Sequence, residues 1–139
     1  GMSMKKILTV IVGVCLAGTL GVSAAEVTID LSKLPPASTK KDLSYEKHIL
    51  PIFKKSCVDC HGPEKQKARL RVDTLEELKK GSRGKPVVVK GKAAKSKLLL
   101  VVARLGDPDE AMPPEGKGDP LTKEQVGLIR AWIDQGLKK

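Results

Sequence analysis

The stretch Cys57-Val58-Asp59-Cys60-His61 decides how the rest of this chain is interpreted. Two cysteines at this spacing can each form a thioether with one vinyl group of the same porphyrin, and the histidine that follows can bind the iron. Few other chemistries require two cysteines and a histidine in this order. We therefore expect one covalent haem c, with thioethers at Cys57 and Cys60 and with His61 as the proximal iron ligand.

Residues 1–25 have the pattern of a secretory signal peptide. Gly1 stands before the first methionine and is treated as an addition to the natural chain. Two lysines are followed by an apolar run over residues 7–22 and then by small residues, which is the order of a cleavable export signal. We expect cleavage near Ala24 or Ala25 and a periplasmic or otherwise exported mature protein. The run is short for a membrane span, so an uncleaved anchor is the alternative.

The mature chain would keep two cysteines, because Cys15 lies inside the apolar run that is removed. In an oxidising compartment Cys57 and Cys60 could instead form a structural disulfide. They could also form the redox-active pair of a thiol–disulfide oxidoreductase. Neither alternative requires a histidine at position 61, and no βαβ pattern surrounds the pair. Haem attachment is therefore the favoured interpretation.

The formal net charge of +10 over 139 residues limits the classes of partner. A basic chain can bind nucleic acid, an anionic membrane or an acidic protein. Nucleic acid is disfavoured, because the lysines are dispersed and aromatic residues are not interleaved with them. Membrane association of the mature chain is not indicated. We expect a redox protein partner with an acidic docking surface, steered by the lysines that flank the motif: Lys54, Lys55, Lys65 and Lys67.

Aromatic residues make up only 2% of the chain, namely Tyr45, Phe53 and Trp132. A buried porphyrin would explain this low content, since it fills space that aromatic side chains usually occupy. Drift in composition explains it equally well.

Residues 26–43 are expected to form an extended arm, because they contain two prolines and lack helical periodicity. A short strand over residues 27–31 fits the β-branched content. The arm either packs along the domain or reaches toward a membrane or partner.

The remainder, residues 44–139, has the signals of one helical domain. Ser44 is a candidate N-cap, and Pro51 requires either a kink or a helix that begins near it. Capping boxes begin at Thr74 and Thr122, and Ser96 is the expected cap of a well-buried helix. Residues 106–120 are expected to form a proline-rich loop.

The second axial position of the iron has two candidates. Met112 lies in the proline-rich loop, and a thioether ligand would raise the reduction potential. A methionine that fills a gap in the core is the alternative. His48 precedes the motif too closely to reach the face opposite His61, so ligation by two histidines is a minor alternative. We expect Met112 to be the distal ligand.

The chain resembles the small class I-like c-type cytochromes, specifically the planctomycete-type cytochrome c domain, over nearly all of residues 44–137. The resemblance depends on the order and spacing of several segments, of which only the haem motif is specific by itself. The segments cover residues 49–53, 57–62, 70–73, 112–114 and 121–136, together with Gly91, Ser96 and Leu98.

The resemblance implies a mainly α fold, with N- and C-terminal helices that cross beside the haem and at most very short strands. Phe53 and Trp132 would lie on these helices and could pack against each other. It also implies the thioether and proximal roles given above and Met112 as the distal ligand.

The function implied is single-electron transfer by a His/Met-ligated haem, without enzymatic activity. One alternative is a five-coordinate haem sensor or peroxidase-like protein, which requires Met112 to be off the iron. Another is an interaction module whose cysteines form a disulfide. Domains of this type are often fused to larger enzymatic regions, so a free carrier and a haem subunit of a larger dehydrogenase complex both stay open.

Overall fold

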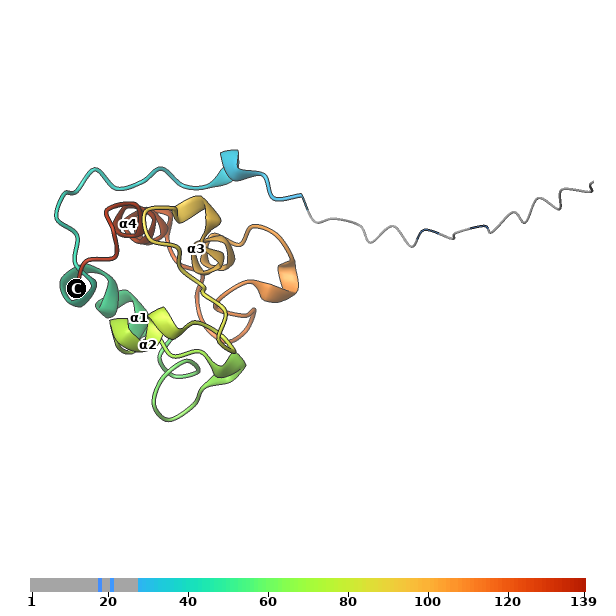
Figure 1. The fold of residues 1–139 in the computed structure, drawn as a ribbon, viewed down its shortest axis with the longest axis horizontal. Coiled ribbons are helices and arrows are strands. Elements are labelled where there is room, and N and C mark those ends of the chain that lie inside the picture. Colours follow the sequence, from blue (N-terminus) through green and yellow to red (C-terminus); the bar gives the residue numbers. More distant parts are fainter. Residues whose placement is uncertain (1–17, 19–20, 22–27) are drawn as a thin grey trace, which may run out of the picture.

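The structure, a computed structural model, describes residues 18, 21 and 28–139. Within these residues the chain folds mainly as helices, and β-structure is limited to isolated bridges. The expected mainly helical fold is confirmed. The four α-helices are arranged around a central region (Figure 1), and their bounds are α1 Leu50–Ser56, α2 Leu75–Lys80, α3 Lys97–Val102 and α4 Lys123–Asp134.

The predicted signal peptide lies almost entirely outside the described residues, so its cleavage stays a prediction. Among the residues that the structure describes, no helix is both long enough and apolar enough to cross a bilayer.

The N-terminal helical segment begins at Ser44, as predicted. The Ser44 side chain accepts a hydrogen bond from the amide of Lys47 and caps a π-helical turn, η2 Tyr45–Ile49. Helix α1 then begins at Leu50 with Pro51 in its first turn, where the missing N–H has no helical partner to lose. We expected either a kinked helix at Pro51 or a helix that begins near it, and the structure has a helix that begins near it.

The three aromatic residues form one cluster in the core. Tyr45 lies between the other two, with ring centroids 6.1 Å from Phe53 and 5.9 Å from Trp132. The indole N–H of Trp132 donates to the carbonyl of Lys138 at 2.8 Å. The N-terminal segment and the C-terminal helix α4 thus pack together, with Tyr45 as the bridge between Phe53 and Trp132.

The two predicted capping boxes have different outcomes. At α4, Thr122 accepts from the amide of Gln125, and the Gln125 side chain accepts from the amide of Thr122, which completes the box. At α2, Thr74 accepts from the amide of Glu77, but the Glu77 carboxylate pairs with Lys80 at 2.6 Å. The prediction is therefore confirmed in full for α4 and in half for α2.

Ser96 stands at the N-cap position of α3, as predicted, but its side chain makes no capping hydrogen bond. Ser96 is fully buried, accepts from the amide of Val89 and donates to the carbonyl of Lys92, both at 2.9 Å. Its hydroxyl therefore links Val89 and Lys92, which both precede the helix, and accepts no hydrogen bond from the amides of the first turn of α3. The expectation that α3 is well buried is confirmed, since Leu98, Leu99 and Val102 are buried.

The predicted strand over residues 27–31 is wrong for the part that the structure describes, and Val27 lies outside it. Residues 28–30 are irregular, and Leu31 begins a 3-10 turn, η1 Leu31–Lys33. The Asp30 carboxylate accepts from the amide and hydroxyl of Ser32. This local bonding satisfies the backbone without a neighbouring strand.

The arm packs along the domain, which is one of the two arrangements expected for it (Figure 1). Leu34 is buried, and the guanidinium of Arg130 on α4 donates to the carbonyl of Pro35 at 2.8 Å. The amide of Ser38 donates to the carbonyl of Gly127 at 3.0 Å. The arm therefore covers one face of α4 as part of the same core.

A Gly127→Val variant is expected to loosen the arm. A Cβ atom at Gly127 would lie 2.5 Å from the carbonyl oxygen of Pro36 and 3.5 Å from the amide nitrogen of Ser38. Because neither the helix nor the arm backbone can yield without losing hydrogen bonds, we expect a destabilisation of about 1–3 kcal/mol. Tryptic cleavage after Lys40 should become faster, which limited proteolysis followed by mass spectrometry would measure.

The control is Glu124→Val, which places valine at an exposed position of the same helix. It introduces the same β-branched side chain into the same helix, at a residue whose side chain is exposed. Equal cleavage rates in the two variants would contradict the role assigned to Gly127.

Candidate haem site

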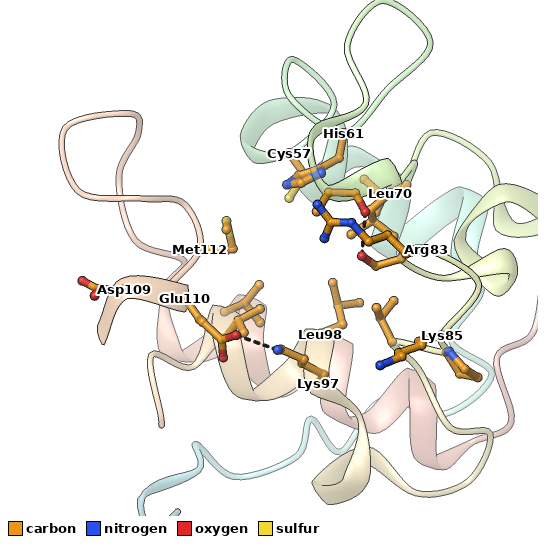
Figure 2. Close-up of a pocket in the computed structure, with 17 residues that line it drawn as sticks. Cys57, His61, Leu70, Arg83, Lys85, Lys97, Leu98, Asp109, Glu110 and Met112 are labelled. Atoms are coloured by element: carbon orange, nitrogen blue, oxygen red, sulfur yellow. Dashed lines mark hydrogen bonds and ion pairs between the residues drawn. The ribbon is translucent and has the colours of Figure 1, made fainter. Parts of the chain in front are cut away.

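One cavity of about 450 Å³ lies between the haem motif, helix α3 and the loop that carries Met112. Figure 2 shows Cys57 and His61 on one side of this cavity and Met112 projecting toward them from another side. The structure therefore brings together three of the four predicted site residues. Much of the wall is apolar and is formed by Leu70, Val72, Val87, Leu98, Val101 and Val102.

The imidazole of His61 is oriented by a backbone carbonyl. Its Nδ1 lies 2.9 Å from the carbonyl oxygen of Lys67. Because a carbonyl can only accept, Nδ1 is the protonated nitrogen and Nε2 keeps its lone pair for a metal. The loop that presents this carbonyl is closed on the motif, since the amide of Lys67 donates to the carbonyl of Cys60 at 2.9 Å.

The glycine that follows the motif is required by close packing. A Cβ atom at Gly62 would collide with the carbonyl oxygen of Val58 and would lie 2.8 Å from its Cγ1 atom. The amide of Gly62 also donates to the carbonyl of Lys65 at 2.8 Å. Gly62 thus allows the chain to turn back tightly enough to place Lys67 beside His61.

The two cysteines occupy different surroundings. Both are free thiols and half-buried, but only Cys57 lines the cavity. Burial, with a smaller contribution from the neighbouring Cys60, raises the pKa of the Cys57 thiol to about 11. The amide of Cys60 donates to the carbonyl of Cys57 at 3.1 Å, so both lie on one turn of chain. A thiol at Cys57 therefore stays protonated at neutral pH.

The loop that carries Met112 is attached to α3 and to Arg104, which lies just beyond the end of this helix. The amide of Met112 donates to the carbonyl of Val101 at 3.1 Å. The guanidinium of Arg104 donates to the carbonyl of Pro113 at 2.8 Å. Glu110, on the 3-10 turn η5 Pro108–Glu110, pairs with Lys97 at 2.8 Å, as Figure 2 shows. These bonds hold the loop on both sides of the methionine.

Comparison with protein families identifies the domain. Residues 57–116 match the family model described as Planctomycete cytochrome C. This match supports a planctomycete-type cytochrome c domain in this part of the chain. The matched residues begin at the haem motif and end just past Met112, within the longer region over which the sequence resembles this family. No curated protein and no solved structure matches the chain.

The cytochrome c domain implies binding of haem c, and the cavity fits such a group. Its volume lies within the range of about 300–1,000 Å³ that is usual for ligand and cofactor pockets. A histidine with a free Nε2 and a thioether are ligands that haem iron takes in proteins. Apolar walls suit the porphyrin ring, and Cys57 lines the same cavity as both candidate ligands.

His48 is placed away from this cavity of the cytochrome c domain. Its Nδ1 accepts a hydrogen bond from the amide of Ser44 at 3.0 Å, next to the cap of η2. It is not among the residues that line the cavity. The structure therefore offers no support for ligation by His48.

Several residues of the site could not be identified from the sequence. The carbonyl of Lys67 carries no side-chain signal, and Arg104 stands among many other basic residues. The expected steering lysines, such as Lys54 and Lys65, are exposed but do not line the cavity. The cations that do line it are Arg83, Lys85 and Lys97. Only the fold distinguishes these from the other basic residues.

Proposed function

We propose that this c-type cytochrome is an exported, monohaem electron carrier rather than an enzyme. The observation that carries the proposal is that His61 and Met112 reach one apolar cavity from different elements, with Cys57 in its wall. Cys57 and Cys60 would hold the haem as thioethers, and His61 and Met112 would be the axial ligands. When bound, the haem supplies a one-electron couple at its iron.

The residues of the chain would hold the haem in a site from which water is largely excluded. His61 keeps Nε2 available because Nδ1–H donates to Lys67. The attachments of the Met112 loop would hold the thioether in place as a ligand, and a substrate would then find no free position on the iron. The apolar wall excludes water and favours the less charged, reduced state, as thioether ligation also does.

The partner we propose is a redox protein with an acidic docking surface. Exposed cations surround the haem motif and the cavity, and such charges raise association rates with a partner of opposite sign. The export signal predicted for residues 1–25 supports an exchange in the periplasm or outside the cell. The rate of reaction with the partner should fall as salt is added.

The test is the absorption spectrum of protein matured in a periplasm that can attach haem c. The expected spectrum has a Soret band that survives denaturation, together with the far-red charge-transfer band of methionine bound to iron(III). Absence of a Soret band would overturn the proposal and leave a disulfide-bonded interaction module. A Soret band without the far-red band, together with rapid carbon monoxide binding, would instead identify a five-coordinate sensor or peroxidase-like protein.

An Arg104→Gln variant is expected to weaken the retention of Met112. The hydrogen bond from the guanidinium to the carbonyl of Pro113 has a charged donor, and such bonds contribute about 1.5–3 kcal/mol. Imidazole, which competes with the thioether for the iron, should therefore bind about tenfold more tightly or better. A spectroscopic titration of the oxidised protein measures this affinity.

Arg130→Gln is the matched control, because Arg130 makes the same type of bond at the same 2.8 Å distance, but to Pro35 in the arm. It should lower stability without changing imidazole affinity. If the two variants bind imidazole equally, Arg104 has no specific role at the methionine loop.

A further inference from the structure

The charged residues at the cavity are separated by sign. Arg83 and Lys85 contribute to the cavity from the segment between α2 and α3, whereas Asp109 and Glu110 contribute from η5. Figure 2 shows Asp109 and Glu110 on one side and Arg83 and Lys85 on the other. The remaining cation, Lys97 on α3, is already paired with Glu110 at 2.8 Å. The side of the cavity formed by Arg83 and Lys85 is therefore cationic. On the η5 side Asp109 is acidic, and the charges of Glu110 and Lys97 neutralise each other.

The two cations are presented by a tight turn. The amide of Ser82 donates to the carbonyl of Lys85, and the amide of Lys85 donates to the carbonyl of Ser82, both at 2.9 Å. The central residues Arg83 and Gly84 have φ values of 50° and 76°. This combination is that of a two-residue type I′ turn, in which glycine, asparagine and aspartate are preferred at both positions.

An arginine in the first of these positions contradicts the local preference of the turn. Residues kept in a disfavoured backbone region are concentrated at binding sites, where the surroundings or a ligand compensate the strain. The turn itself is held to the cavity wall, since the Ser82 hydroxyl donates to the carbonyl of Ala68 at 2.6 Å. Arg83 and Lys85 are also absent from the ion pairs that the structure has within residues 28–139.

We propose that Arg83 and Lys85 bind the carboxylate groups of the haem and hold the propionate edge of the ring at this turn. The inference rests on the proposed haem attachment and goes beyond it. A porphyrin with two propionates has one anionic edge, and burial of that edge requires cations or hydrogen-bond donors. The carboxylates of Asp109 and Glu110 on the η5 side would repel the propionates, which favours their pairing with the cations of the turn.

Other charged groups near the turn do not change this balance of sign. On its other side Arg83 borders a smaller cleft that contains two arginines, one lysine and one acidic residue. In that cleft the lysine is paired with the acidic residue, and one arginine is paired with Asp73. The residues concerned are Arg69, Arg71, Glu77 and Lys80. On the side of this smaller cleft, therefore, the surroundings of the turn are cationic and no unpaired carboxylate competes for Arg83.

The experiment compares the pH dependence of the reduction potential in the holoprotein and in an Arg83→Gln, Lys85→Gln double variant. Loss of the paired cations raises the pKa of a carboxylate, typically by about 1–3 units. The pH range in which the potential varies because of the propionates should therefore move upward by about one unit or more. The Soret and far-red bands report that the double variant keeps its haem and its axial ligands.

Two further variants complete the test. Lys79→Gln removes an exposed cation of α2 that does not line the cavity, and it should leave the titration where it is in the natural protein. Asp109→Asn should lower the titration by less than the double variant raises it. The single variants Arg83→Gln and Lys85→Gln, both at exposed positions, are measured in case the double variant does not fold.

A shift in the double variant and in at least one single variant, without a shift in Lys79→Gln, supports the proposal. Titrations that coincide in the natural protein and the Arg83 and Lys85 variants overturn it, as does a larger shift in Asp109→Asn. If the natural protein has no Soret band, the proposed function fails as well. That outcome is distinct from a haem-containing protein whose propionates titrate independently of the turn.

Discussion

A Met112→Ala variant of the haem-containing protein is expected to lose the far-red charge-transfer band completely. The thioether is the only ligand we assign to that side of the iron, and alanine cannot replace it. Because thioether ligation favours the reduced state, the reduction potential should fall by at least about 60 mV, which is a tenfold change in a one-electron equilibrium. Carbon monoxide should bind the reduced variant without first displacing a ligand. Redox titration and flash photolysis measure these two effects.

The expected loss is specific because the loop remains attached to α3 without the methionine side chain. The amide at position 112 still donates to the carbonyl of Val101, and Arg104 still donates to the carbonyl of Pro113. Met112→Leu is the matched control for packing, since it retains an apolar side chain but has no sulfur. An alanine variant with unchanged spectrum and potential would remove Met112 from the iron and make it a core residue.

Replacement of Trp132 by alanine is expected to have the largest effect on stability. The side chain is fully buried beside Tyr45, and truncation of a buried tryptophan costs about 3–5 kcal/mol. The indole hydrogen bond to Lys138 is lost as well. Urea unfolding of the holoprotein, followed by far-UV circular dichroism, measures the change in the free energy of unfolding.

The effect should extend to the haem site through a chain of contacts. Trp132 packs on Tyr45, and the Tyr45 hydroxyl donates to the carbonyl of Val72. The amide of Val72 in turn donates to the carbonyl of His61 at 2.9 Å. Burial raises the pKa of Tyr45, with further contributions from nearby carboxylates, so this hydroxyl stays a donor across the neutral range.

Trp132→Phe separates packing from hydrogen bonding. It retains most of the apolar volume but removes the indole donor to the carbonyl of Lys138, which keeps its hydrogen bond from the amide of Tyr45 at 2.8 Å. We therefore expect a loss of about 0.5–1.5 kcal/mol, the net contribution of one hydrogen bond. Equal losses in the phenylalanine and alanine variants would show that the hydrogen bond, and not burial, is the main contribution of Trp132.

Local signals in the sequence predicted the parts of the fold that depend on neighbouring residues. A threonine followed by glutamine three positions later was sufficient to predict the start of α4, since both capping bonds form within one turn. The start of α1 beside Pro51 likewise follows from the covalent geometry of proline. Ser96 has the predicted N-cap position, but its hydroxyl does not bond to the first turn of α3 because it is buried with partners at Val89 and Lys92.

By itself the sequence determined the chemistry that is available: a cysteine–histidine motif typical of haem attachment and one methionine in a proline-rich loop. Only the tertiary structure decided that Met112 faces His61 across one cavity and that the arm covers α4. It also decided that Arg83 and Lys85, among 26 basic residues, line that cavity. The physical reason is that hydrogen bonds within one turn depend only on neighbouring residues, which can be identified in the sequence. In contrast, the position of a side chain at a shared cavity depends on how segments far apart in the chain pack together.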